Sequence, residues 1–243
     1  MANWSDPRTT AASRPATAGS TREAAFDAGL RSYMLSVYNY MASGVLLTGI
    51  VALLFANSGL AAQVLSTPLR WLVMLAPLAF VMVLSFGINR LSTGTAQALF
   101  WAFAVAMGLS LSSIFLVYTG GSIAQTFFAA AAAFGGLSLF GYTTKKDLSG
   151  FGTFLIMGVV GLLVAMLINI FLQSSVMQLA ISGIGVLLFA GLTAYDTQKI
   201  KSIYFHVQGT DFVGKSVVMG ALTLYLDFVN MFTFLLSFMG DRR

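Results

Sequence analysis

Seven long apolar segments, separated by short polar connections, constrain the fold of this chain more than any other feature of its sequence. Each segment is long enough to cross roughly 30 Å of hydrocarbon as an α-helix. We expect membrane spans over residues 33–56, 71–89, 95–118, 121–143, 151–172, 176–195 and 216–239. The alternating pattern of a transmembrane β-strand is absent, so the expected fold class is all-α.

Composition supports a membrane protein, because only 9% of the residues are charged and 58% are hydrophobic. Soluble domains usually carry about 25% charged residues, so this chain could not cover a water-facing surface. The net charge of +5 is typical of membrane-protein loops, and no nucleic-acid partner is expected. Polar residues 1–30 are expected to form a flexible cytoplasmic tail before one transmembrane domain, residues 31–243.

The distribution of Lys and Arg predicts the orientation of the chain in the membrane. If all seven segments cross, ten of the 13 basic residues share the side of the N-terminus, and Arg70, Arg242 and Arg243 lie on the other. Cytoplasmic loops carry the positive excess, so the N-terminus is expected inside. A last segment that dips in and returns would bring Arg242 and Arg243 inside as well. That segment is nevertheless long enough to span, and we favour seven spans.

The residue inventory argues against several kinds of enzyme. The chain has no cysteine and one histidine, His206, which excludes thiolate catalysis and multi-histidine metal sites. His206 is expected in a solvated loop, and neither a nucleophile elbow nor a Gly-x-x-x-x-Gly-Lys-Ser/Thr phosphate loop is present. We therefore predict that the protein is not an enzyme and needs no cofactor, apart from weakly bound Ca²⁺.

Two aspartates are the main candidates for function. Asp227 lies deep inside the last segment, in LYLDFVN, and Asp196 closes the segment before it, in AGLTAYDTQKIK. A charge at the bilayer centre costs about 2.5–3.5 kcal/mol on insertion scales, so such residues usually face the protein interior, a water-filled cavity or a partner. Two simpler interpretations remain: Asp196 as a helix-end acid beside Lys199, and Asp227 as an acid paired with a neighbour such as Asn230.

Whether the two carboxyls meet is left open by the sequence. Their helices are antiparallel, but Asp196 is expected at a helix end and Asp227 about 11 residues, or roughly 16 Å, into the next helix. If they meet, they would titrate as a unit, because two carboxylates in a low dielectric do not both ionise readily. The pair could then hold a proton, pair with Arg90 or a lysine, or bind Ca²⁺ weakly.

Intramembrane aspartyl proteolysis also requires two aspartates within the membrane. The Tyr195-Asp196 pair resembles the first motif of that class of protease. The second motif, Gly-x-Gly-Asp, is missing, because Leu224-Tyr225-Leu226 precedes Asp227. This is the least favoured interpretation.

Three stretches resemble the Bax-inhibitor (TMBIM) family of transmembrane proteins over about residues 30–240. They are MGLSLSSIFLVYTGGSIAQTFFAAAAAFGGLSLFGYTTKKDLSGFG at 107–152, GVLLFAGLTAYDTQKI at 185–200 and LYLDFVNMFTFLLSFMG at 224–240. The resemblance implies a seven-helix fold in which the other six helices wrap a central last helix. It also implies a Ca²⁺-permeable, pH-sensitive leak gated by two aspartates, which match Asp196 and Asp227.

The same resemblance implies an arginine latch in the second helix, for which only Arg90 is available here, and an alternative function. Some bacterial members are modulators of FtsH-type membrane proteases, and in some of these the last-helix aspartate is replaced. The presence of Asp227 favours the leak. We therefore expect a multi-pass protein of the bacterial inner membrane, with Ca²⁺ and H⁺ as its ions and Arg90, Asn230 and Lys199 as supporting residues. A protease-binding protein is the alternative, and a purely structural role is the third option.

Overall fold

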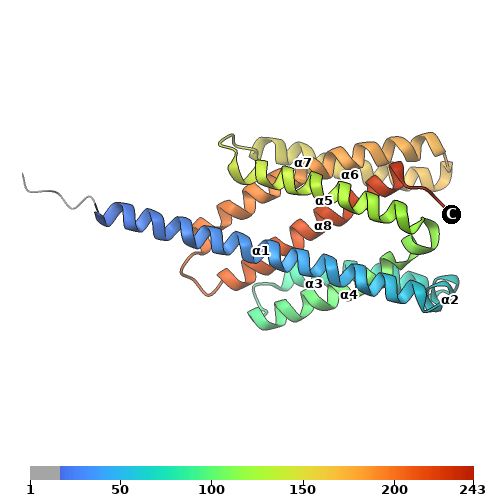
Figure 1. Ribbon diagram of the computed structural model, residues 1–243, viewed down its shortest axis with the longest axis horizontal. Helices are drawn as coiled ribbons and strands as arrows, with labels where there is room; N and C mark the ends of the chain where they lie inside the picture. Colours follow the sequence, from blue (N-terminus) through green and yellow to red (C-terminus); the bar gives the residue numbers. More distant parts are fainter. Residues whose placement is uncertain (1–16) are drawn as a thin grey trace, which may run out of the picture.

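The computed structural model describes the backbone of residues 17–243 and the side chains of residues 25–243. Within these residues the chain is helical, apart from turns and an isolated bridge between Tyr118 and Arg242. The helices are α1 (Thr17–Asn57), α2 (Leu60–Ser66), α3 (Leu69–Gly87), α4 (Thr93–Val117), α5 (Gly120–Thr143), α6 (Ser149–Leu172), α7 (Ser175–Val207) and α8 (Val213–Met239) (Figure 1). In this part of the chain, seven helices are long and apolar enough to cross a membrane, which confirms the all-α seven-span fold.

Hydroxyl side chains at the polar connections determine where several helices begin. Ser92, Thr119 and Ser174 each accept a hydrogen bond from the backbone N–H three residues later, at the start of α4, α5 and α7. Such N-caps satisfy donors that have no partner within the helix. In the turn between α7 and α8, Gly209 has a φ of 73°, which glycine adopts without the strain of a Cβ.

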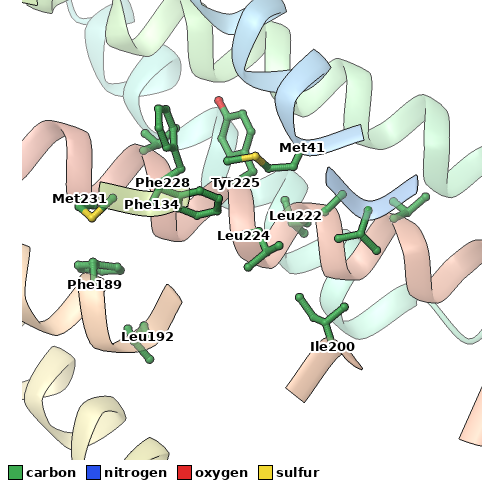
Figure 2. Close-up of a cluster of buried hydrophobic side chains, with 14 of the residues drawn as sticks. Met41, Phe134, Phe189, Leu192, Ile200, Leu222, Leu224, Tyr225, Phe228 and Met231 are labelled. Carbon is green, nitrogen blue, oxygen red and sulfur yellow. The ribbon is translucent and has the colours of Figure 1, made fainter. Parts of the chain in front are cut away.

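The last helix lies at the centre of the bundle, as expected (Figure 1). In the most apolar stretch of α8, 61% of the residues are buried, compared with 11–33% in the other six spans. Its main contacts are with α7, α1, α5 and α4, whereas α3 and α6 lie further out, on α4 and α7 respectively. Figure 2 shows Leu224, Phe228 and Met231 of α8 among side chains from α1, α5 and α7. Side chains of α8 therefore make up much of the apolar core.

Helix α8 crosses the whole bundle and does not fold back. It begins beside the end of α7 and finishes beside the connection between α4 and α5, at the opposite end (Figure 1). There the Thr119 N–H donates to the Asp241 carbonyl at 3.1 Å, and the Arg243 N–H donates to the Val117 carbonyl at 2.9 Å. The re-entrant alternative for the last segment is therefore wrong.

Most expected spans agree with the observed helices to within a few residues, but two helices extend well beyond the spans expected for them. Helix α7 continues to Val207 instead of ending at 195, which places His206 in its last turn rather than in a loop. Helix α1 begins at Thr17, inside the segment expected to be a flexible tail, and the rest of that tail, residues 1–16, lies outside the described residues.

The two helical extensions support each other. The ring of Phe26 on α1 lies 5.4 Å from Tyr204 and 5.0 Å from Phe205 on α7, measured between centroids. Tyr33, two turns further along α1, lies 5.2 Å from Tyr204. These aromatic contacts bury apolar surface that neither polar-looking segment could bury alone. The pattern of continuous apolar runs does not predict these aromatic contacts, because charged residues lie among the aromatic ones in both segments.

Candidate functional site

The side chains of Asp196 and Asp227 lie next to each other where α7 packs on α8, so that each carboxyl acts on the other. Asp196 is 9% exposed and Asp227 is 4% exposed, so both belong to the protein interior. An ionised carboxylate can only accept hydrogen bonds, so a bond between the two carboxyls would require a proton on one of them. The arrangement therefore suits a pair that shares one proton.

The contact forms because α7 does not end at Asp196. About eleven further residues of helix separate Asp196 from Val207, which corresponds to about 16 Å. After the short turn over residues 208–212, α8 begins at Val213, about 14 residues or 21 Å before Asp227. The two aspartates therefore lie at similar depths. The separation expected from a helix end at 195 was wrong because the polar segment that follows remains helical.

One oxygen of the pair has no partner. Asp227 Oδ2 is buried and accepts no hydrogen bond within the described part of the chain. A buried polar atom without a partner typically costs about 1–3 kcal/mol, and more when it is charged. This cost makes Asp227 a candidate functional residue, since an acid inside a membrane span is otherwise rare.

Three residues were expected to support the pair, and the structure gives each of them different surroundings. Lys199, about one turn along α7, acts electrostatically on Asp196, although its amine is exposed and lies 5.9 Å from the centre of the Tyr195 ring. Asn230 instead donates to the Leu226 carbonyl of its own helix, at 2.8 Å. Arg90 is exposed in the turn after α3, a helix that packs on α4 and α2. Of the three, only Lys199 acts on an aspartate of the pair.

A hydroxyl network beside the pair was not anticipated from the sequence. The Tyr38 hydroxyl on α1 is 2.9 Å from Ser138 Oγ on α5, which is 2.9 Å from Thr197 Oγ1 on α7. Thr197 directly follows Asp196 and is fully buried. Serine and threonine are common in membrane helices, and Tyr38 and Ser138 are 100 positions apart, so no local pattern could have identified this network.

Close packing fixes the position of α7 against α5 at this level. A Cβ atom on Gly141 would collide with the backbone carbonyl of Ala194, two residues before Asp196. About two turns further along α7, the Lys201 amine donates to the Tyr142 carbonyl at 2.8 Å. Small residues allow such close approach between membrane helices. The register of Asp196 therefore depends on a glycine in another helix.

The acidic residues do not form a dense metal centre. Among residues 25–243, no group of three or more His, Cys, Asp or Glu side chains is close enough to share a metal ion. Protein-bound Ca²⁺ takes six to eight oxygens. The aspartate pair supplies four oxygens at most, so the donor set fits a passing cation better than a tightly held one.

Comparison with known proteins places the chain among bacterial relatives. The family described as "Inhibitor of apoptosis-promoting Bax1" matches residues 30–243. Inner membrane protein YbhL of Escherichia coli K12 is 48% identical over 220 residues, which cover 89% of this chain and 94% of YbhL. An uncharacterised protein of Rickettsia prowazekii is 47% identical over 220 residues, which cover 90% of this chain and 93% of the Rickettsia protein. A protein of Caulobacter vibrioides, also uncharacterised, is 48% identical over 231 residues, which cover 89% of this chain and 91% of the Caulobacter protein.

The family match covers nearly the whole transmembrane domain, and positions 196 and 227 lie within it. The chain therefore belongs to the Bax inhibitor family of integral membrane proteins.

Proposed function

We propose that this protein is a pH-sensitive cation leak channel, permeable to Ca²⁺, in which Asp196 and Asp227 form the gate. The single observation that carries the proposal is the pair of buried, neighbouring carboxyls between α7 and the central helix α8. Because α8 contacts four other spans, a change in how it packs on α7 would be transmitted through the bundle. The pair is thus well situated to control a path along the last helix.

The proton shared by the pair is the proposed control element. Losing it would set two negative charges against each other in a low dielectric, and gaining a second one would remove the charge altogether. Either change alters the free energy of packing between α7 and α8. Two arrangements that differ in the protonation of one pair would then be populated according to pH. The unpartnered Asp227 Oδ2 offers an acceptor to a proton or a passing cation.

The test is Ca²⁺ flux into liposomes that contain the purified protein, measured between pH 5 and pH 8. We expect flux to change with pH in the unaltered protein, by no more than about tenfold per pH unit if one proton controls the gate. Asp196→Asn and Asp227→Asn should each abolish the pH response. Asp211→Asn, in the turn between α7 and α8, is the matched control. Unchanged flux and pH response in both pair variants would show that the gating idea is wrong.

The proposed location is the bacterial inner membrane, with the N-terminus in the cytoplasm. The printed name of the relative YbhL refers to the inner membrane. In this chain, one end of the bundle carries most of the basic side chains, namely Arg31, Arg90, Lys145, Lys146, Lys199, Lys201 and Lys215. The excess of Lys and Arg on cytoplasmic loops favours this end as the inner one. Since the chain has no cysteine, single cysteines at 146 and 243 can be labelled separately from either side of the membrane to test the orientation.

Binding to an FtsH-type protease is the alternative if no flux is found. Crosslinking to the protease in cells would support it, provided that the signal is lost when the tail is removed. The deletion should cover residues 2–16 only, because Phe26 and Leu30 pack in the bundle core. Loss of crosslinking with an intact fold would then identify the tail as the binding segment.

Intramembrane proteolysis is the least supported of the three functions. It also needs two neighbouring aspartates, but in addition it needs space for a peptide and water beside them. Neither Asp196 nor Asp227 lines the groove between α1 and α5 or the polar cavity beside the start of α6. The Gly-x-Gly-Asp motif of that protease class is also missing from the sequence, and for this reason we propose conduction rather than hydrolysis.

A further inference from the structure

A groove of about 660 Å³ lies between α1 and α5. Helix α1 packs on α4 and α8, and α5 packs on α7 and α8, so Phe228 of α8 closes the groove from behind. In Figure 1, α8 is visible between these two helices. Met41, Phe134 and Phe228, which line the groove, are labelled in Figure 2. The volume is within the range of pockets that bind small molecules, about 300–1,000 Å³.

The groove opens towards the hydrocarbon of the bilayer. Both helices that form its walls are membrane spans, and Leu46 and Leu139 in its lining are 65% and 63% exposed. Its lining is almost wholly apolar, with polar groups only at Arg31, Tyr38, Ser138 and Tyr142. Water would find few hydrogen-bond partners in such a groove, whereas an acyl chain can fill it because it has no polar groups of its own.

The polar groups are unevenly distributed along the groove. Arg31 and Tyr142 lie at the end where the basic side chains gather, and Lys201 lies over the Tyr142 ring, 4.9 Å from its centre. From Arg31 to Leu46 the groove follows about 22 Å of α1, which is more than half of a roughly 30 Å hydrocarbon layer. A cation at one end and an apolar channel of this length complement a phospholipid, with its phosphate at the basic end and one chain inside the groove.

We propose that this groove is a binding site for an anionic phospholipid of the bilayer, whose phosphate is held by Arg31 and whose acyl chain lies between α1 and α5. This proposal does not depend on the channel function, because it concerns lipid retention and not flux. The lipid-binding proposal and the channel proposal can therefore be disproved independently of each other.

Native mass spectrometry of the detergent-purified full chain, with phosphatidylglycerol or phosphatidylcholine added in turn, measures lipid retention directly. We expect one phosphatidylglycerol to be retained several-fold better than phosphatidylcholine. Arg31→Gln should remove this preference. Arg90→Gln, an exposed arginine at the same end of the bundle but away from the groove, should leave it unchanged. Equal retention of the two lipids by the unaltered protein would overturn the role given to Arg31.

Two adjacent glycines on α5 provide a matched test of the groove itself. Gly135 lines the groove and Gly136 does not, and a Cβ on either would meet no atom within 4 Å. Gly135→Leu should lower the retention of both lipids, whereas Gly136→Leu should not. Ala42→Leu, which fills the groove from α1, should reproduce the effect of Gly135→Leu. Equal retention in the Gly135 and Gly136 variants, with unchanged melting temperatures, would show that lipid does not occupy this groove.

Discussion

Asp196 and Asp227 lie next to each other in the interior of the bundle, although they come from opposite sides of the turn over residues 208–212. The contact joins the long helix α7 to the most buried helix, α8. Asp227 Oδ2 is buried there and accepts no hydrogen bond from the described part of the chain, so a proton on one of the two carboxyls would allow them to bond to each other.

Replacement of Asp227 should separate the role of the hydrogen bond from that of the charge. In Asp227→Asn the amide can still donate to the Asp196 carboxylate, so we expect a change in unfolding free energy below about 1 kcal/mol. Asp227→Ala leaves Asp196 buried without its partner and should destabilise the protein by about 1–3 kcal/mol or more. Thermal unfolding in detergent measures both. Equal losses in the two variants would show that the hydrogen bond contributes nothing to stability.

The hydroxyl network should behave as a coupled unit. Ser138→Ala removes the link between Tyr38 and Thr197, and it should destabilise the protein by about 1–3 kcal/mol because both hydroxyls lose a partner. In a double-mutant cycle, Tyr38→Phe and Ser138→Ala should be non-additive by at least about 0.5 kcal/mol. Tyr40→Phe, on the same helix, is the control for Tyr38→Phe. Additive effects within experimental error would mean that the hydroxyls act independently.

Gly141 should tolerate no larger residue. In Gly141→Ala the new Cβ would collide with the Ala194 carbonyl, so α5 and α7 must separate, at a cost of about 1–3 kcal/mol. Gly136→Ala meets no atom within 4 Å and should be neutral or stabilising by up to about 1 kcal/mol, as expected from helix propensity. Melting temperatures of the two variants provide the comparison. A Gly141→Ala variant as stable as Gly136→Ala would contradict the close contact.

Asp147 allows a prediction of pH dependence outside the membrane spans. Hydrogen bonds from the Ser149 hydroxyl and the Ser149 backbone N–H, the latter at 2.9 Å, lower the pKa of this carboxyl. The stabilisation is therefore fully present above the ordinary pKa of an aspartate and is lost as pH falls through the lowered value. Amide hydrogen exchange at the start of α6 should increase at low pH in the unaltered chain and change less in Asp147→Asn.

The same residue serves as a control for the proposed gate. The pKa of Asp147 is lowered, so this carboxyl stays ionised from pH 5 to pH 8 and cannot produce a pH response in that range. Asp147→Asn should therefore leave the pH dependence of Ca²⁺ flux as it is in the unaltered protein. If the pH response became flatter in this variant, Asp196 and Asp227 would not be the proton-sensing site.

Hydropathy alone predicts the class of fold, which the structure confirms, and it singles out two acids as candidates for function. Seven apolar segments of sufficient length must become helices in a bilayer, because no other local structure satisfies the backbone there. Asp227 could be recognised for a similar reason, since an acid in the middle of such a segment is costly unless it lies inside the protein. Both conclusions follow from the solvent and need no knowledge of how the helices pack.

Whether Asp196 and Asp227 lie next to each other depends on how the helices pack. The answer depended on α7 continuing to Val207, and that extension is stabilised by Phe26 and Tyr33, which are distant in sequence from Tyr204. The Tyr38–Ser138–Thr197 network and the groove between α1 and α5 likewise arise from contacts between separate helices. Hydropathy reports how each segment interacts with lipid, whereas these features come from how segments interact with one another. That information appears only when the helices are packed together.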